Sequence, residues 1–362
     1  MRFAGQPLWS LAAPALAWLA YALVPQDAYG GLGAAILFAA LVASVFAGVH
    51  HAEVIAHRVG EPFGTLVLAL AVTVIETALI VSIMLSAEGG QPTLARDAVF
   101  ATVMIVLNGV VGLCVVVGGA RHREQGFQVL GAASYLGVLT TLAVLTLVLP
   151  VYTVSTPGPF FTPAQLMFVS VCSVTLYAVF LFVQTVRHRD YFLPELRAHD
   201  EAAHAAPPLG AKTALSAFTL PVALSAVVWI AKDVAPAIGS AAAGLGLADT
   251  TALVGAVVAL LVLLPESLAA VSAARRDRLQ TSLNLALGSG LATIALTIPA
   301  VAMVTLWLGK PLVLGLENKE LVLLALTLLV STITLASGRT TVLQGAVHLV
   351  IFAAFLFLLV AP

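Results

Sequence analysis

Charged side chains are scarce in this chain. Only 9% of its 362 residues are Asp, Glu, Lys or Arg, whereas a soluble globular domain carries about 25%. The hydrophobic fraction is 61% and the mean hydropathy is +1.08, so too little polar surface is available to cover a water-soluble particle. The net charge of −1 provides no basic excess, and we therefore expect no nucleic-acid partner.

Cysteine and the common catalytic motifs are also scarce or missing. Cys114 and Cys172 both lie inside apolar runs, which favours small core residues over a disulfide or a metal site. The sequence contains no P-loop, no GxSxG elbow and no HExxH motif, so direct coupling to ATP is not expected. We expect no resident cofactor.

Long apolar runs dominate the sequence instead. About 20 residues cross a 30 Å hydrocarbon core as a helix, which predicts an all-α polytopic membrane protein in contact with membrane lipids. The run from Leu8 to Leu23 follows Arg2 and could be a cleaved signal peptide, but its length and its aromatic residues favour a first membrane helix. The span that begins near residue 31 is expected to continue as a helix to about His57. The predicted eleven spans lie near 8–24, 31–50, 63–86, 98–119, 128–150, 163–186, 213–231, 250–272, 280–308, 319–337 and 341–360.

The basic residues predict the orientation of these spans. Lys and Arg concentrate in cytoplasmic loops, and a cytoplasmic N-terminus places twelve of the 16 basic residues on the cytoplasmic side. The long polar connection from Arg187 to Lys212 is then a cytoplasmic linker, and the C-terminus lies outside. The twelve are Arg2, Arg58, Arg121, Arg123, Arg187, Arg189, Arg197, Lys212, Arg275, Arg276, Arg278 and Arg339, and the other four are Arg96, Lys232, Lys310 and Lys319.

Two segments of the chain resemble each other. VTVIETALIVS precedes RDAVFATVMIVLNGVVGL, and VLLPESLAAVS precedes RDRLQTSLNLALGSGLAT, so Glu76 matches Glu266 and Arg96-Asp97 matches Arg276-Asp277. Because each half has five spans, the two halves would insert in opposite directions, as in many secondary transporters. The expected organisation is an N-terminal helix in 1–28, a first five-helix repeat in 29–187, the linker in 188–212 and a second five-helix repeat in 213–362.

Glu76 and Glu266 are the two acidic residues that fall deep inside predicted spans, while the other 15 of the 17 lie at span ends or in loops. An ionised carboxylate at a helix centre costs about 2.5–3.5 kcal/mol on insertion scales. Burial and a neighbouring carboxylate both favour the protonated form, so such a pair can exchange protons for a cation. A structural alternative is a pair of protonated glutamates that joins helices by hydrogen bonds.

Two glutamates cannot supply the roughly six to eight oxygens that calcium takes. Pro265 lacks an N–H and is expected to loosen the helix before Glu266, which frees a carbonyl. Small residues at Gly109 and Gly288 would open the backbone or let helices pack closely. Hydroxyl and amide oxygens could complete the site, although membrane Ser and Thr more often bond their own helix; the candidates are Thr73, Asn108, Ser267, Asn284 and Ser289.

Several histidines lie in or near predicted spans. His50, His51, Glu53 and His57 have helical spacings that could ligate a metal, but they lie at the cytoplasmic end of a span, where a solvated helix end is the favoured interpretation. With Glu61 they could otherwise serve cytoplasmic cation access or pH sensing. His348, in the last span, is expected to be a packed or hydrogen-bonded core residue.

At these positions the sequence resembles a known family. The stretches HAEVIAHRVGEPFGTLVLALAVTVIETALI, LLPESLAAVSAARRDRLQTSLNLALGSGLATIALTIP and ASGRTTVLQGAVHLVIFAAFLF are similar to ChaA-type bacterial antiporters of the calcium:cation antiporter superfamily, which includes the CAX exchangers. The resemblance covers nearly the whole chain. It implies ten core helices in two inverted repeats, one extra N-terminal helix, and Glu76 and Glu266 as the carboxylates that bind metal ions and protons.

The sequence also departs from that family pattern. Val72-Thr73 and Val262-Leu263 stand where CAX proteins have Gly-Asn, and Ala292 replaces a common Gln after Gly288-Ser289. Fewer side-chain ligands remain, which argues for relaxed selectivity among Ca2+, Na+ and K+. We therefore expect a cation:proton antiporter of the bacterial inner (plasma) membrane. The alternatives are a channel or uniporter without proton coupling, and an intramembrane enzyme built on the His50–His57 region.

The orientation is testable with reporter fusions at the two ends of the chain. The twelve-to-four distribution of basic residues predicts a cytoplasmic signal at the N-terminus and a periplasmic signal at the C-terminus. A cytoplasmic signal from the C-terminal fusion would show that the span count or the orientation is wrong.

Overall fold

A computed structural model of the chain describes residues 2, 3, 5–24, 31–60, 63–86, 92–193, 210–244, 246 and 249–361. The chain forms two compact units. The first unit comprises Met1–Gln91 and Glu201–Gly246, and the second comprises Pro92–Asp200 and Leu247–Pro362. This division follows packing, and each unit takes helices from both halves of the sequence, so the inverted repeats stay a prediction.

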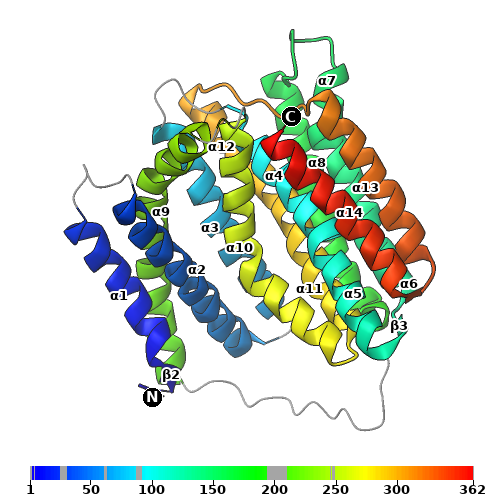
Figure 1. The fold of residues 1–362 in the computed structure, drawn as a ribbon, viewed down its shortest axis with the longest axis horizontal. Helices are drawn as coiled ribbons and strands as arrows, with labels where there is room; N and C mark the ends of the chain where they lie inside the picture. The colour runs from blue at the N-terminus through cyan, green and yellow to red at the C-terminus, as the bar shows by residue number, and fades with distance from the viewer. Residues whose placement is uncertain are drawn as a thin grey trace. The chain divides into compact units, whose positions relative to one another are not determined.

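The first unit is a helical bundle built around α2 and α9. The helix α2 packs against α1, α3 and α9, and α9 packs against α3 as well (Figure 1, blue and green). Leu37, Leu41 and Val45 recur every four residues on the buried face of α2, as expected for helical periodicity. The elements are β1 (Arg2–Phe3), β2 (Gln6–Pro7), α1 (Leu8–Leu23), α2 (Leu32–Val59), α3 (Phe63–Ser86) and α9 (Gly210–Gly244).

The second unit contains longer helices that are interrupted by π-helical turns. The α4–η2–α5, α6–η3–α7, α8–η4 and α11–η6–α12 segments each run without a break. The elements are α4 (Leu94–Met104), η2 (Ile105–Val110), α5 (Val111–His122), β3 (Gln125–Gly126), α6 (Val129–Ala143), η3 (Val144–Val148), α7 (Leu149–Tyr152), α8 (Pro163–Phe182), η4 (Val183–Arg187), η5 (Arg189–Tyr191), α10 (Thr250–Arg275), α11 (Leu279–Ala292), η6 (Thr293–Thr297), α12 (Ile298–Leu308), α13 (Asn318–Ala336), β4 (Arg339–Thr340) and α14 (Val342–Val360).

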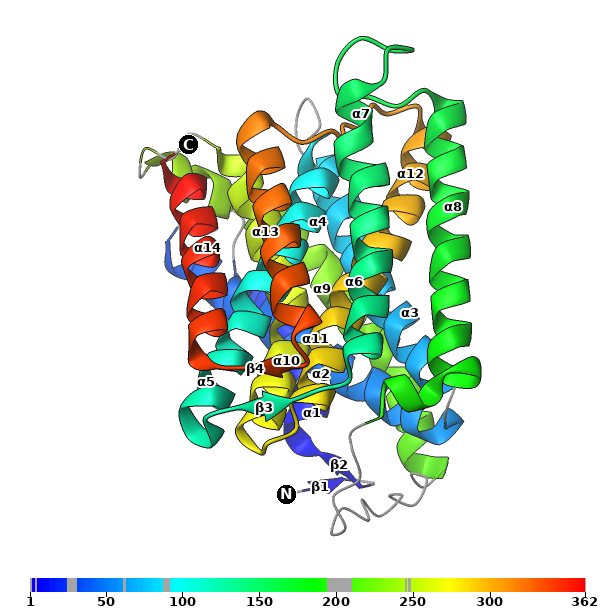
Figure 2. The same cartoon turned by 90° about the vertical axis from the view of Figure 1, so that its right-hand side faces the viewer.

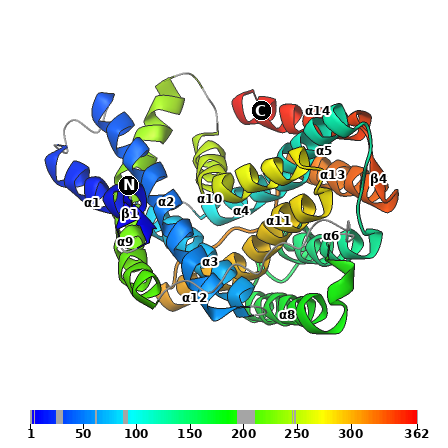
Figure 3. The same cartoon turned by 90° about the horizontal axis from the view of Figure 1, so that it is seen from below.

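Within this unit α10 packs against α4, α5 and α11, and Figure 3 shows these helices from below. The helices α14, α13, α6 and α8 stand side by side, as Figure 2 shows. One face of α14 exposes Leu343, Val350 and Phe357, while the opposite face buries His348 and Phe355. An exposed stripe that is wholly apolar is what a lipid-facing helix requires.

The predicted spans agree with the helices. In the described part of the chain, nine helices are long and apolar enough to cross a membrane, and Leu8–Leu23 and Ala71–Met84 are shorter apolar helices. These eleven correspond to the eleven predicted spans, and α2 does continue past His57 to Val59. The first helix is therefore present as expected, whereas residues 194–209 of the predicted linker lie outside the described residues.

One span prediction was too short, and one predicted break is absent. The helix α9 runs 35 residues to Gly244, through Pro221 and Pro236. Asp233, within this helix, accepts a hydrogen bond from Tyr21 Oη (2.9 Å). Pro265 does not break α10, which continues from Thr250 to Arg275.

Glycines allow the closest helix crossings of the second unit. A Cβ built on Gly345 of α14 would lie 2.7 Å from the backbone nitrogen of Val116 in α5, and one on Gly112 would lie 2.9 Å from His348 Cβ. The two backbones touch because neither carries a side chain there, which is the usual device for packing helices in lipid.

Two glycine substitutions test how closely the helices approach at this crossing. Gly345→Ala should destabilise the folded protein by about 1–3 kcal/mol, the scale of an overpacked core, because the new methyl group meets backbone atoms. Gly137→Ala should be neutral, since nothing lies within 4 Å of a Cβ at Gly137 on α6. Thermal unfolding in detergent measures both, and equal melting temperatures for the two variants would contradict the close crossing.

Candidate functional site

Glu76 lies in the middle of α3, in the first unit. It is the one charged residue of that 24-residue helix, and only 1% of its surface is exposed. Its neighbours along the helix, Ile75 and Leu79, are buried and apolar, and Thr73, one turn earlier, is buried too. Burying two polar side chains in an apolar membrane helix costs free energy, so such residues usually mark a functional site.

Glu266 lies in α10, in the second unit, on a helix surrounded by α4, α5 and α11. Glu266 and its neighbours Pro265 and Ser267 are half-buried. Pro265 has no N–H, so the carbonyl of Leu261 lacks its usual helical donor although the helix continues. Ser267 Oγ donates to Leu263 O (2.7 Å), and the hydroxyl oxygen keeps lone pairs that a cation can use.

The remaining predicted oxygens lie on the third helix of each half. Asn108 lies in η2 beside Gly109, with its amide nitrogen donating to Thr327 Oγ1 of α13 (2.9 Å). Ser289 is half-buried on α11 beside Gly288. The glycines were expected to open the backbone or allow close packing. Gly109 allows close packing, because a Cβ there would lie 3.2 Å from Phe352, whereas a Cβ on Gly288 would make only an ordinary contact, 3.6 Å from Tyr135 Oη.

Asn284 makes two hydrogen bonds that the sequence did not predict. Its amide nitrogen donates to Phe192 O (2.6 Å), and its oxygen accepts from Gln280 Nε2 (3.0 Å). These bonds join the first turns of α11 to the chain just after η5. Asn284 stays a candidate ligand only through the second lone pair of its oxygen.

The expected solvated helix end at His50 and His51 is wrong. His51 is fully buried, with Nδ1 3.0 Å from Ser216 Oγ and Nε2 3.0 Å from Ser10 O. His50 Nε2 lies 3.0 Å from Gln6 Oε1, and its ring packs on Trp9. The reason is tertiary packing, because α1 and α9 provide the partners of His51 and β2 provides the partner of His50. Helical periodicity could not reveal these contacts.

The other members of this cluster are not gathered around the histidines. Glu53 and His57 are exposed on α2, and Glu61 lies outside the described residues. Across the described residues no group of three or more His, Cys, Asp and Glu side chains is arranged to hold a metal ion. The four-residue metal cluster considered from the spacing is therefore not assembled.

The sequence analysis missed two buried acids at one end of the second unit. Asp97 and Glu320 are only 3% and 5% exposed. Asp97 Oδ1 accepts from Arg96 Nε (2.7 Å), while Arg96 Nη1 donates to Gly315 O (3.2 Å). Glu320 Oε2 accepts from the backbone nitrogen of Glu317 (2.9 Å) in a capping box. The adjacent Arg-Asp pair and the Glu-x-x-Glu spacing were the available signals.

The matching Arg276-Asp277 pair of the second half is used differently. Asp277 has a positive φ of 59° in the turn after α10 and accepts from Gln125 Nε2 (3.0 Å). Equivalent sequence therefore gives a buried ion pair in one half and a turn in the other.

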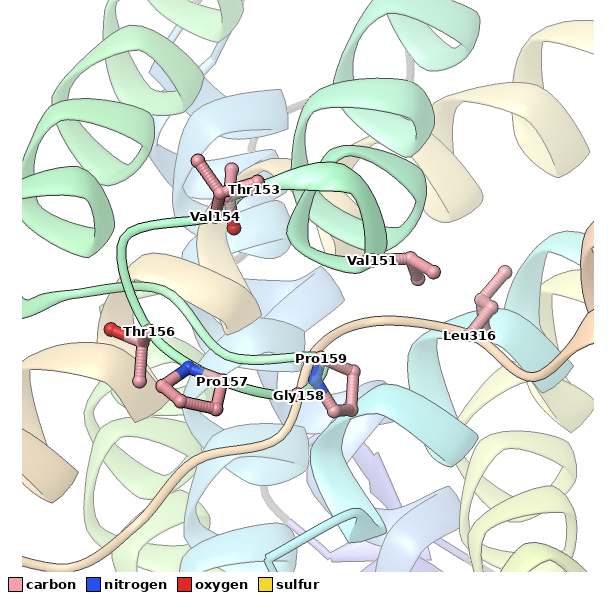
Figure 4. Close-up of a pocket in the computed structure, with 8 residues that line it drawn as sticks. All are labelled: Val151, Thr153, Val154, Thr156, Pro157, Gly158, Pro159 and Leu316. Carbon is pink, nitrogen blue, oxygen red and sulfur yellow. The ribbon is translucent and has the colours of Figure 1, made fainter.

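A surface cavity of about 520 Å³ opens near the loop between α7 and α8. Figure 4 shows its lining: Val151, Thr153, Val154, Thr156, Pro157, Gly158, Pro159 and Leu316. None of these side chains ionises, so this cavity cannot supply the carboxylates of a cation–proton site.

In the part of the chain that the structure describes, nine long and two shorter apolar helices define a polytopic membrane protein. The structure superposes on native YfkE with a TM-score of 0.73 at 17% identity, over 98% of this chain and 99% of that one. It superposes on the H+/Ca2+ exchanger CAX with a TM-score of 0.70 at 15% identity, over 96% and 88%. At these identities the likeness shows the fold.

The sequence then identifies the family. Residues 29–186 and 215–361 match the sodium/calcium exchanger protein family, and the chain belongs to it. It is 49% identical over 368 residues to y4hA of Sinorhizobium fredii (strain NBRC 101917 / NGR234), covering 100% of this chain and 98% of that protein. It is 35% identical over 323 residues to the sodium-potassium/proton antiporter ChaA of Escherichia coli (strain K12), covering 89% and 87%.

A third relative is the Ca2+/H+ antiporter of Aphanothece halophytica, which is 26% identical over 295 residues, covering 76% of this chain and 77% of that one. These matches confirm the resemblance to ChaA-type antiporters of the calcium:cation antiporter superfamily.

Proposed function

We propose that this protein is a secondary active antiporter that exports Ca2+, and also Na+ and K+, in exchange for H+. The observation that carries the proposal is a glutamate in the middle of each of two apolar helices, α3 and α10, of a chain that belongs to an exchanger family. The relatives named as a sodium-potassium/proton antiporter and as a Ca2+/H+ antiporter support the same ions.

In this proposal Glu76 and Glu266 alternately bind protons and a cation. Each carboxyl group must lose its proton before it can ligate a cation, so binding one ion requires release of the other. Thr73, Asn108, Ser267, Asn284 and Ser289 are proposed as additional oxygen donors, with waters and the Leu261 carbonyl completing the shell. No covalent chemistry and no resident cofactor are needed, because the driving force is the proton gradient.

We propose that groups of helices move as rigid bodies and expose the site to each side of the membrane in turn. The first helices of the two predicted repeats, α2 and α9, pack against each other along the first unit, and α3 packs on both. Glu76 therefore lies on a helix held by both of these helices, so it would move with them. The expected location is the bacterial inner membrane, with a cytoplasmic N-terminus and an outside C-terminus.

The alternatives are less well supported. An intramembrane enzyme would use the His50–His57 region, but His50 and His51 hold the N-terminal hairpin and α9 through Gln6 and Ser216. A channel or uniporter would have no need of two protonatable groups, and it would show cation flux without proton release.

Neutral replacement of either glutamate should abolish exchange. Glu76→Gln or Glu266→Gln preserves side-chain volume but cannot cycle a proton, so cation-driven proton release in proteoliposomes should fall at least about 100-fold, the scale of losing an essential proton-transfer group. Glu53→Gln, at an exposed position of α2, is the matched control and should keep most of the activity. Near-normal exchange by either purified variant would contradict the assignment.

Calcium and sodium should compete for the same site. Coulomb energy scales with the product of charges, which favours Ca2+ at a dicarboxylate, but a site with few side-chain ligands should also accept Na+ and K+. Mg2+ should be poor because it demands a tight octahedron and dehydrates reluctantly. In everted vesicles each accepted cation should release stored protons, more strongly as the pH rises from 7 to 9. If Na+ neither releases protons nor reduces Ca2+ uptake across that range, the protein is a dedicated calcium exchanger.

A further inference from the structure

Four buried polar side chains connect three helices of the second unit. His348 of α14 places Nδ1 3.1 Å from Asn108 Oδ1 and Nε2 3.0 Å from Thr334 Oγ1. Asn108 Nδ2 lies 2.9 Å from Thr327 Oγ1. None of the four is more than 3% exposed, and all lie inside apolar spans, where each bond replaces a partner that lipid cannot provide.

The bonding pattern defines one hydrogen arrangement. Thr327 Oγ1 donates to Met104 Sδ (3.4 Å), so its lone pairs receive the amide N–H of Asn108. The Asn108 oxygen therefore faces His348, and because an amide oxygen only accepts, His348 Nδ1 carries the hydrogen. His348 Nε2 is then an acceptor for the Thr334 hydroxyl. When the His348 imidazole is neutral, each donor in this network therefore faces an acceptor.

The amide that this histidine orients lies in η2, the π-helical turn Ile105–Val110. On its other sides that turn packs against α10, the Glu266 helix, and against α11, the Ser289 helix. A Cβ on Gly290 of α11 would lie 3.1 Å from Val106 of this turn, so the backbone of α11 approaches η2 closely. The network thus supports η2 from α13 and α14, opposite the helices that carry two of the proposed ligands.

We propose that His348 is a positioning residue for cation binding: its Nδ1–H orients the Asn108 amide and holds the turn Ile105–Val110 against α10 and α11. This inference rests on the proposed antiport function. His348 acts through the hydrogen bond that it donates to the Asn108 oxygen.

Two isosteric substitutions test which ring nitrogen matters. The amide nitrogen of Asn can take the place of Nδ1 as a donor, so His348→Asn keeps the bond to Asn108. His348→Gln loses that bond and places its amide nitrogen near Thr334, whose hydroxyl oxygen can accept from it. His348→Gln should raise the KM for Ca2+ by about 5- to 30-fold, the scale of one lost buried hydrogen bond, with a smaller change in maximal rate. His348→Asn should keep the wild-type KM and the wild-type pH profile, because no proton is carried at this position.

A second pair of variants keeps the test independent of folding at position 348. Thr327→Val removes the acceptor of the Asn108 amide and should raise KM as His348→Gln does. Thr332→Val is the matched control, because Thr332 is exposed on the same helix and bonds only its own Leu328 carbonyl (2.7 Å). Hydrogen–deuterium exchange of the purified protein should show faster amide exchange across 105–110 in His348→Gln and Thr327→Val, and unchanged exchange in His348→Asn and Thr332→Val.

The possible outcomes distinguish a failure of the proposed antiport function from a failure of the proposed role of His348. A wild-type protein that shows no cation-driven proton release overturns the proposed function itself. Wild-type exchange with equal KM values for His348→Asn and His348→Gln, or a wild-type KM for Thr327→Val, overturns only the positioning role. A shifted pH profile in His348→Asn would also overturn it, because that shift would show that His348 carries a proton.

Discussion

A polar group in hydrocarbon has no water to bond, so the protein must supply its partner. Several hydroxyls in the spans meet this requirement locally: Thr146, Ser170, Ser173 and Thr305 each donate to the carbonyl four residues earlier. Helix ends meet it with capping boxes, such as the one that Thr341 and Gln344 form at the start of α14. Hydrogen bonds of this kind stay within one helix and do not constrain how that helix packs. The few polar groups that bond to another helix are therefore the ones that specify tertiary structure.

Charged side chains obey the same constraint, and burying one without a partner costs more free energy than burying a neutral polar group. Arg96 and Asp97 are buried together, and the guanidinium also caps the Gly315 carbonyl, so the pair joins the start of α4 to the extended segment before α13. Removing one member of such a pair is costly because it leaves the other charge buried and unpaired. Glu76 and Glu266 stand on apolar helices without any such adjacent basic residue in the sequence. A proton or a cation is the simplest neutralising partner for a carboxylate in that position, which connects the folding constraint to transport.

Close backbone contact is the second consequence of folding in lipid. Where Gly112 and Gly345 meet, α5 and α14 approach until their backbones touch, since dispersion and hydrogen bonds must replace the missing hydrophobic drive. That approach brings His348 within reach of Asn108. The glycine crossing and the polar network therefore act together. The small residues set the distance between α5 and α14, and the hydrogen bonds set the position of η2 between its neighbours.

The sequence by itself determined the class of protein, because span length and charge distribution are one-dimensional properties. It also predicted the extent of α2 and the two embedded glutamates, since an acid in an apolar run is visible without a structure. Only tertiary structure decided the contacts of His51, Asn108 and Asn284, each of which bonds a partner 41 or more residues away in sequence. The same holds for the continuation of α10 through Pro265 and of α9 through Asp233. Hydropathy measures the average preference of a segment for lipid, whereas a hydrogen bond depends on where one atom of a distant segment arrives, and packing alone determines that.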